Sequence, residues 1–332
     1  MPVTVEIERR NGGDKPGFGW TCPQCNTAAD MVDVRRNLSV CPTCGHHLRI
    51  SARERIKQLA DLDSFSELWA GMRAQDPLDF VDIETYPERV RAAQAKTGLN
   101  DALVAGTADI IEVPCVLAVM DFGFMGGSRG SVVGEKLWRA AATAADEGRP
   151  LVTVASSGGA RMQEGALSLM QMAKTTCAVD VVNDARVPFV AVMADPCTGG
   201  VVASFVSLAD ICVAEPGALL YFSGPRVISQ TTREQLPADF GSAERNLVLG
   251  HLDAIVPRSE LKDKVANYLR LLKGGGQTDG LERRAAPRPR GGRTRRLARA
   301  ASARVAAAFK DPGSEPLGGG GPAPGSPEEP PA

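Results

Sequence analysis

The apolar positions in the middle of the chain form three continuous runs, and each run ends at a pair of glycines. Continuous apolar runs of this length are typical of strands buried on both faces of a sheet. A helical pattern follows each pair, and the pairs are 32 and 41 residues apart. The pattern predicts a layered α/β domain with an internal structural repeat. The runs are CVLAVMDFGFMGG, LVTVASSGG and FVAVMADPCTGG, ending at Gly126-Gly127, Gly158-Gly159 and Gly199-Gly200, and the helical segments are SVVGEKLWRAAATAADEG, EGALSLMQMAKTTCAVDVVNDA and VVASFVSLAD.

Changes in this pattern indicate the domain boundaries. Ser51, with Glu54 three residues later, predicts a capping box at the start of a helix. After Lys273 the chain is rich in Gly, Pro and Arg, and such a composition buries too little apolar surface to become ordered. The sequence predicts four regions: a flexible arm over 1–17, a small cysteine-rich ribbon over 18–50, the α/β domain over 51–273 and a disordered tail over 274–332.

Composition and charge change this picture little. With 332 residues and 43% hydrophobic residues, the chain can build a sizeable core. The net charge of −1 conceals a basic tail, because residues 281–310 contain ten Lys or Arg and one acid. The first twenty residues have no apolar core segment, and no apolar run could cross a bilayer. We therefore expect a cytoplasmic protein without a membrane partner.

Four cysteines near the start of the chain have the spacing of a metal site. Cys22, Cys25, Cys41 and Cys44 form C-x2-C-x15-C-x2-C. Four thiolates in this pattern select zinc and fill its coordination sphere, so we expect one structural zinc ion per chain. A catalytic zinc, with a neighbouring histidine in place of one cysteine, is the less favoured alternative. The remaining four cysteines lie in or beside apolar segments and are predicted to be core thiols: Cys115, Cys177, Cys197 and Cys212.

The glycine pairs allow three interpretations. A serine nucleophile at Ser156 or Ser157 would need a histidine base, and the chain has only three histidines and no G-x-S-x-G motif. Neither phosphate-binding motif, G-x-G-x-x-G or G-x-x-x-x-G-K-[ST], is present. Tight turns in a packed domain remain possible, as does an oxyanion hole made of backbone N–H groups at the start of a helix.

Five motifs, in order along about residues 18–270, resemble one known family. CPQC…CPTCGHHLRI, FMGGSRGSVVGEK, SSGGARMQEGALSLMQMAKT, DPCTGGVVASF and FSGPRVISQTTREQLP are similar to segments of the β subunit of bacterial acetyl-CoA carboxylase carboxyltransferase. The resemblance implies a crotonase-like (ClpP/crotonase) fold of repeated strand-strand-helix units behind a four-cysteine zinc ribbon. It also implies transfer of a carboxyl group from carboxybiotin to acetyl-CoA, which gives malonyl-CoA for fatty acid synthesis.

The same resemblance implies roles for individual residues. Gly199 and Gly200 would bind the enolate oxygen of acetyl-CoA, and Gly158 and Gly159 would shape the facing loop. The released biotin would accept the proton, which fits the lack of a candidate general base. Gly126, Gly127 and Arg161 are candidate acyl-CoA contacts, although Arg161 is more typical of a local ion pair and Glu164 of a helix-dipole partner. Cys197 is a less favoured candidate nucleophile. Three methionines are expected in the core rather than in an acyl pocket: Met162, Met170 and Met172.

A second crotonase-like domain is missing from this chain, so the resemblance implies that an α subunit completes the site, as α2β2. Biotin would be carried by a separate carrier protein, and ATP would be used by a separate biotin carboxylase. Two alternatives stay open. One is a carboxyltransferase or decarboxylase for another acyl-CoA, such as propionyl-CoA. The other is a nucleic-acid-binding zinc ribbon with a basic tail, although aromatic residues make up only 5% of the chain.

Overall fold

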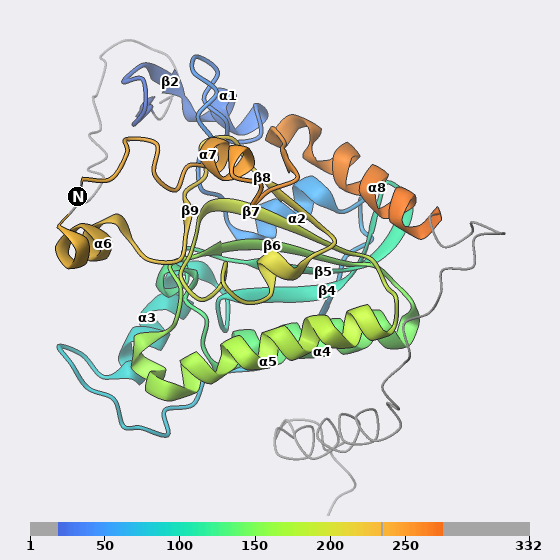
Figure 1. Cartoon of the computed structure of the whole chain (residues 1–332), viewed down its shortest axis with the longest axis horizontal. Helices are drawn as coiled ribbons and strands as arrows, with labels where there is room; N and C mark the ends of the chain where they lie inside the picture. The colour runs from blue at the N-terminus through green and yellow to red at the C-terminus, as the bar shows by residue number, and fades with distance from the viewer. Residues whose placement is uncertain (1–18, 234, 275–332) are drawn as a thin grey trace, which may run out of the picture. The chain divides into compact units, whose positions relative to one another are not determined.

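A computed structural model describes residues 19–233 and 235–274, and its main feature is one mixed β-sheet (Figure 1). The predicted arm and, apart from Gly274, the predicted tail lie outside the described residues. The central strands β5 to β8 are parallel, whereas β3 and β4 are antiparallel at one edge. The order is β10-β8-β7-β6-β5-β4-β3, with β9 beside β7. Their bounds are β3 Ser66–Leu68, β4 Leu103–Ile110, β5 Val113–Met120, β6 Leu151–Ser157, β7 Phe189–Thr198, β8 Ile211–Ala214, β9 Leu220–Tyr221 and β10 Ala254–Ile255.

Helices cover both faces of this sheet, which explains the continuous apolar runs. The long helices α4 and α5 lie on one face, and α2 and α8 lie on the other (Figure 1). Every residue of β6 is consequently buried. No helix among the described residues is both long and apolar enough to cross a membrane. The helix bounds are α2 Ala52–Leu59, α3 Tyr86–Thr97, α4 Ser131–Glu147, α5 Gly165–Asp184, α6 Pro225–Thr232, α7 Ala243–Val248 and α8 Arg258–Gly274.

Two local predictions differ from the structure. The segment after Gly200 forms turns and the short 3-10 helix Val206–Leu208 instead of an α-helix. The Ser204 hydroxyl bonds the Gly200 carbonyl at 2.6 Å, and such side-chain bonds compete with helical ones. At α2, Ser51 caps the helix, but the Glu54 carboxylate accepts from the Ser39 hydroxyl instead of completing the box.

The ribbon consists of β1 (Gly19–Thr21), β2 (Ala28–Asp30) and α1 (Met31–Arg36). Arg258, at the start of α8, attaches it to the domain. The Arg258 guanidinium donates to three ribbon carbonyls at 2.9 to 3.2 Å and pairs with the buried Glu215. The backbone N–H of Arg258 also donates to Nε2 of His47, and burial lowers the pKa of that imidazole. The ribbon and the domain therefore share a buried polar contact.

Candidate functional site

Three glycine loops lie side by side at the carboxyl ends of β5, β6 and β7. We call residues 121–130 the first loop, residues 158–164 the second and residues 199–210 the third. The strands are adjacent and parallel, so their carboxyl ends meet at one edge of the sheet. In open α/β sheets this edge is where ligands bind. The topology thus brings together all six glycines that the sequence analysis selected.

Two of these glycines permit a close approach between loops. A Cβ atom at Gly127 would lie 2.1 Å from the carbonyl oxygen of Ser156, so no side chain fits there. Gly199 has a φ of 63°, and a Cβ atom there would lie 3.0 Å from the Cα atom of Gly159. The Gly158 N–H also donates to the Gly126 carbonyl oxygen at 2.9 Å. Much of the glycine pattern thus serves contact between backbones.

Most of the glycine N–H groups are already paired within the protein. Gly199 donates to the carbonyl oxygen of Tyr221 at 2.9 Å, and Gly127 donates to that of Phe124 at 2.9 Å. Gly159 donates to the Ser157 hydroxyl at 3.0 Å. The N–H of Gly200, in contrast, has no acceptor among the residues that the structure describes. Within the pair Gly199-Gly200, only the second residue has a free donor for a ligand.

The candidate nucleophiles lack the partners that a nucleophile needs. Burial raises the pKa of the Cys197 thiol, which disfavours the thiolate. The Ser156 hydroxyl donates to the carbonyl oxygen of Asp195, and the Ser157 hydroxyl accepts from Gly159. None of the hydrogen bonds among the described residues joins a histidine to either serine. The structure therefore gives no support to a serine or cysteine nucleophile at the loops.

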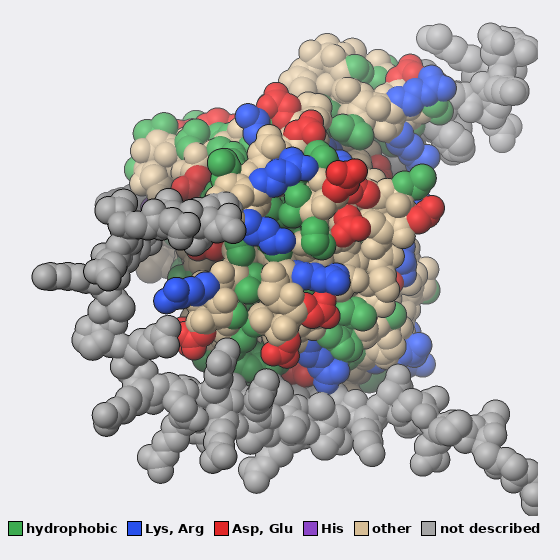
Figure 2. All heavy atoms as spheres, turned by 90° about the vertical axis from the view of Figure 1, so that its right-hand side faces the viewer, with side chains coloured by type: hydrophobic (Ala, Val, Ile, Leu, Met, Phe, Trp, Pro, Cys, Tyr) green, Lys and Arg blue, Asp and Glu red, His purple; other side chains and the backbone are tan. Residues whose placement is uncertain are grey.

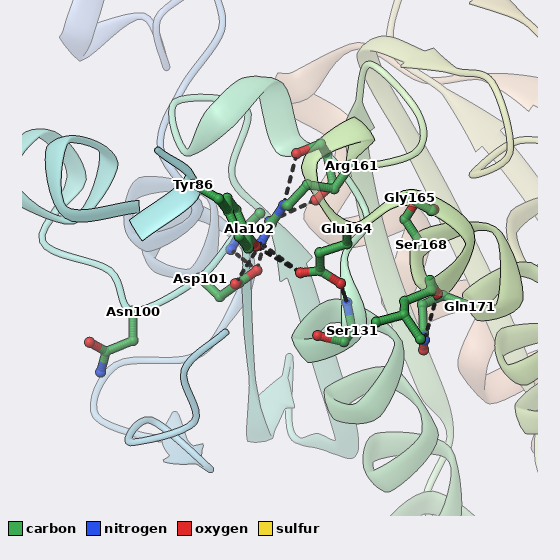
Figure 3. Close-up of polar contacts among 12 residues, drawn as sticks. Tyr86, Asn100, Asp101, Ala102, Ser131, Arg161, Glu164, Gly165, Ser168 and Gln171 are labelled. Atoms are coloured by element: carbon green, nitrogen blue, oxygen red, sulfur yellow. Dashed lines mark hydrogen bonds and ion pairs between the residues drawn. The ribbon is translucent and has the colours of Figure 1, made fainter. Parts of the chain in front are cut away.

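Arg161, in the second loop, is part of a buried network rather than a ligand contact (Figure 3). Its side chain is 0% exposed and forms a bidentate pair with Asp101, with both N–O distances 2.8 Å. The remaining N–H groups donate to the Tyr86 hydroxyl and to Ser128. All five donors of the guanidinium are therefore used. In this arrangement no N–H of Arg161 is left for coenzyme A, and its main partner, Asp101, lies 60 residues away along the chain instead of nearby.

Glu164 lies in the same network and acts on a neighbouring helix. Its Oε2 atom accepts from the N–H of Ser131, the first residue of α4, at 2.6 Å. Its Oε1 atom accepts from the Tyr86 hydroxyl at 2.7 Å, and burial raises the pKa of that phenol. From its position in the sequence, Glu164 is predicted to complement the dipole of its own helix, α5. The structure shows instead that Glu164 joins the second loop to α4 (Figure 3).

Arg129, in the first loop, was missed by the sequence analysis and joins all three loops. Its backbone N–H donates to the Gly159 carbonyl at 2.7 Å, in the second loop. Its side chain donates to the Gly200 carbonyl at 2.5 Å and to the Ser204 hydroxyl at 3.0 Å, in the third loop. The available signal was an arginine two residues after a glycine pair, in a segment with no acid nearby.

Two further expectations about individual side chains are wrong. Met162 and Met170 are 80% and 63% exposed instead of buried, whereas Met172 is partly buried beside Gly200. Cys177 is exposed on α5, although the other three isolated cysteines are buried as predicted. Met162 precedes α5, in the 3-10 helix Met162–Glu164, whereas Met170 and Cys177 lie at exposed positions of α5. The even distribution of apolar residues around this helix concealed which face is covered.

The four ribbon cysteines meet at one point, as their spacing predicted. Their sulfur atoms all lie within 4.8 Å of one another. The Sγ atoms of Cys22 and Cys44 are 3.7 Å apart, and those of Cys25 and Cys41 are 3.9 Å apart. Asn26 and Gly45, which follow the two Cys-x-x-Cys pairs, have φ values of 56° and 74° that turn each knuckle. This cluster could hold a metal ion.

Comparison with known proteins defines the class and then the family. Residues 49–243 match the carboxyl transferase domain. A solved structure of transcarboxylase 12S, with methylmalonyl-coenzyme A bound, is 30% identical with a TM-score of 0.56, over 68% of this chain and 41% of that one. The fold and the glycine loops therefore belong to a carboxyl transferase domain.

The similar curated proteins are more specific. The acetyl-coenzyme A carboxylase carboxyl transferase subunit beta of Thermus thermophilus is 52% identical over 81% of this chain and 94% of that protein. The subunits beta/alpha protein of Saccharopolyspora erythraea is 47% identical over 82% of this chain and 48% of that protein. The chain belongs to the family of acetyl-coenzyme A carboxylase carboxyl transferase β subunits.

Proposed function

We propose that this chain, together with an α subunit, transfers the carboxyl group of carboxybiotin to acetyl-CoA and so forms malonyl-CoA for fatty acid synthesis. The observation that carries the proposal is the free Gly200 N–H at the junction of three glycine loops, in a chain of this family. The assembly would work in the cytoplasm, with a separate biotin carrier and an ATP-dependent biotin carboxylase. The domain would be of the crotonase-like class.

The chemistry requires stabilisation of an enolate. Loss of a proton from the methyl group of acetyl-CoA places negative charge on the thioester oxygen, and a preorganised N–H donor lowers that barrier by about 3 kcal/mol. In our proposal the Gly200 N–H is this donor and Gly199 supplies the turn that presents it. Gly158 and Gly159 shape the facing loop, and Gly126 and Gly127 hold the first loop against it. The biotin released from carboxybiotin supplies the base.

The thiol cluster fits zinc in a structural role. Four sulfur atoms at about 2.3 Å from a tetrahedral zinc ion would be about 3.8 Å from one another. The two measured distances, 3.7 and 3.9 Å, agree with this value. Four thiolates leave no coordination position for water, so Cys22, Cys25, Cys41 and Cys44 would hold the ribbon together without taking part in the reaction.

An α subunit as partner is supported by two observations. The Saccharopolyspora erythraea protein is described as subunits beta/alpha, and this chain covers 48% of it. In addition, Met162, Leu169 and Met170 expose apolar side chains before and within the first turns of α5, at 80%, 59% and 63%. Exposed apolar clusters are typical of protein interfaces. We propose that the α subunit covers them in an α2β2 assembly.

Nucleic-acid binding receives less support from the described residues. On the face of the molecule in Figure 2, Lys and Arg side chains alternate with Asp and Glu side chains instead of forming a basic stripe. A nucleic-acid footprint of the usual kind would require such a stripe. The basic segment over 281–310 lies outside the described residues.

Reconstitution tests the proposed function. The full chain is mixed with its α partner and free carboxybiotin, and malonyl-CoA is measured, with propionyl-CoA offered in competition. We expect a complex on size-exclusion chromatography, carboxylation of acetyl-CoA by the pair and almost none by the chain alone. A clear preference for propionyl-CoA would instead favour the alternative substrate. A stable complex that carboxylates neither acyl-CoA would contradict the proposal.

A further inference from the structure

The glycine loops contain a buried cation, the Arg129 guanidinium, that has no role in the reaction proposed above. The Arg129 side chain is 0% exposed, and only its Nη1 atom has acceptors, the Gly200 carbonyl and the Ser204 hydroxyl. The Nε and Nη2 atoms are buried and have no hydrogen-bond partner among the described residues. A guanidinium has five N–H groups, so three of them are unpaired. Buried polar groups are usually paired, and this exception needs a reason.

The charge of Arg129 is also uncompensated. None of the ion pairs among the described residues includes it, in contrast to Arg161. Burial lowers its pKa to about 10, so the guanidinium stays protonated at neutral pH. A buried charge without a counter-ion destabilises a fold, and an uncharged side chain of similar volume would be more stable there. This charge lies against the third glycine loop, where Arg129 donates to Gly200 and Ser204.

Arg129 acts on the peptide group that follows Gly200. The Gly200 carbonyl and the Val201 N–H belong to the same peptide, and in a trans peptide they point in opposite directions. The hydrogen bond from Arg129 therefore holds the carbonyl on one side and turns the Val201 N–H to the other. It also polarises the peptide, which makes that N–H a stronger donor. Neither the Gly200 nor the Val201 N–H has an acceptor among the described residues.

We propose that Arg129 is a positioning residue for the oxyanion site. It holds the peptide group between Gly200 and Val201, and it places a positive charge behind the Gly200 and Val201 N–H groups, which face the thioester oxygen. The inference rests on the proposed function, because it assumes that these N–H groups face the enolate. Arg129 acts through the peptide and not by contact with the substrate, since its unpaired nitrogens are buried. Its charge is of most use in the transition state, when the oxygen becomes negative.

Three variants separate the charge from the hydrogen bond. Arg129→Gln can keep a donor near the Gly200 carbonyl but has no charge, Arg129→Lys keeps the charge, and Arg129→Met keeps neither. Each is paired with the α subunit and assayed for kcat and for KM with acetyl-CoA, and the thermal midpoint of the free chain is measured. We expect kcat to fall roughly 10- to 100-fold in the Gln and Met variants, with KM within about threefold.

The controls distinguish this role from a structural one. We expect Arg129→Lys to retain kcat within about fivefold, and the Gln and Met variants to melt at the wild-type temperature or above it, because a destabilising charge is gone. A Gln variant with wild-type kcat would overturn the role of the charge. A Gln variant that loses kcat only together with a lower melting temperature would make Arg129 a structural clamp. A wild-type pair that makes no malonyl-CoA would contradict the proposed function itself.

Discussion

Arg161 and Arg129 lie in neighbouring glycine loops, and both side chains are fully buried, yet their surroundings are opposite. Arg161 has all five N–H groups paired and a bidentate carboxylate, Asp101. Among the residues that the structure describes, Arg129 has three unpaired N–H groups and no carboxylate partner. The first arrangement is what stability requires of a buried charge, and the second is not. Burial of an arginine is therefore not by itself a sign of function. A buried charge without a counter-ion is the observation that points to a functional role.

The largest expected effect on stability comes from breaking the buried ion pair between Arg161 and Asp101. Arg161→Met leaves Asp101 as a buried carboxylate without its partner, so the free energy of unfolding should fall by about 3–5 kcal/mol. The matched variant Arg129→Met should lower it by much less, or raise it. Urea unfolding of the free chain, followed by circular dichroism, measures both. Equal losses in the two variants would remove the distinction between the two arginines.

The next effect concerns the loop that Arg129 holds. In Gly200→Val a Cβ atom would lie 2.7 Å from Nη2 of Arg129 and 2.8 Å from the Met172 sulfur, so the Arg129 side chain, the Met172 side chain or the loop must shift. Turnover of the reconstituted pair should fall roughly a hundredfold or more, the scale of one lost oxyanion donor.

Two kinds of control accompany that variant. At Gly19 a Cβ atom would meet nothing within 4 Å, so Gly19→Val should keep nearly full turnover. Ser156→Ala, Ser157→Ala and Cys197→Ala should also keep most activity, because no histidine in the described part of the chain is hydrogen-bonded to any of these residues. If these three variants were the inactive ones and Gly200→Val were normal, a side-chain nucleophile would replace the oxyanion site.

A further buried arginine, Arg258 of α8, donates to three carbonyl oxygens of the ribbon. Cys41→Ser should release zinc and unfold the ribbon, because metal affinity in so small a unit is folding energy. The domain should stay folded but melt at a lower temperature, since Arg258 loses these acceptors. Zinc content by atomic absorption and the thermal midpoint test this, and a variant that retains a full equivalent of zinc would refute the four-thiolate site.

The smallest effect is a pH dependence at Glu215, which pairs with Arg55 and Arg258. These partners lower the pKa of the buried Glu215 carboxyl from 4.5 to about 2, despite the opposing effect of burial. The stabilisation is therefore present above about pH 4.5 and is lost as the pH falls towards 2. Glu215→Gln should be less stable at pH 7 and lose less on acidification. Melting temperatures from pH 7 to pH 3 decide this, and parallel profiles would contradict the assignment.

Features that depend on local spacing could be predicted from the sequence alone. The apolar runs predicted the buried strands because helices cover both faces of the sheet. The two Cys-x-x-Cys pairs predicted the thiol cluster because each pair forms its own knuckle. The glycine pairs marked the loops, because a residue without a side chain is needed where two backbones meet. These properties are encoded within a few residues of one another.

Which donors are free and which charges are paired depends on contacts between segments that are far apart in the sequence. Gly199 and Gly200 are adjacent, but the N–H of Gly199 is taken by Tyr221, 22 residues away. Arg161 is paired with Asp101, 60 residues earlier, whereas Arg129 receives no carboxylate from residues 19–233 or 235–274. Which face of α5 stays exposed, as at Met170, likewise depends on what packs against the helix. Partners so distant in sequence are chosen by the packing of the sheet and its loops, and no local pattern records them.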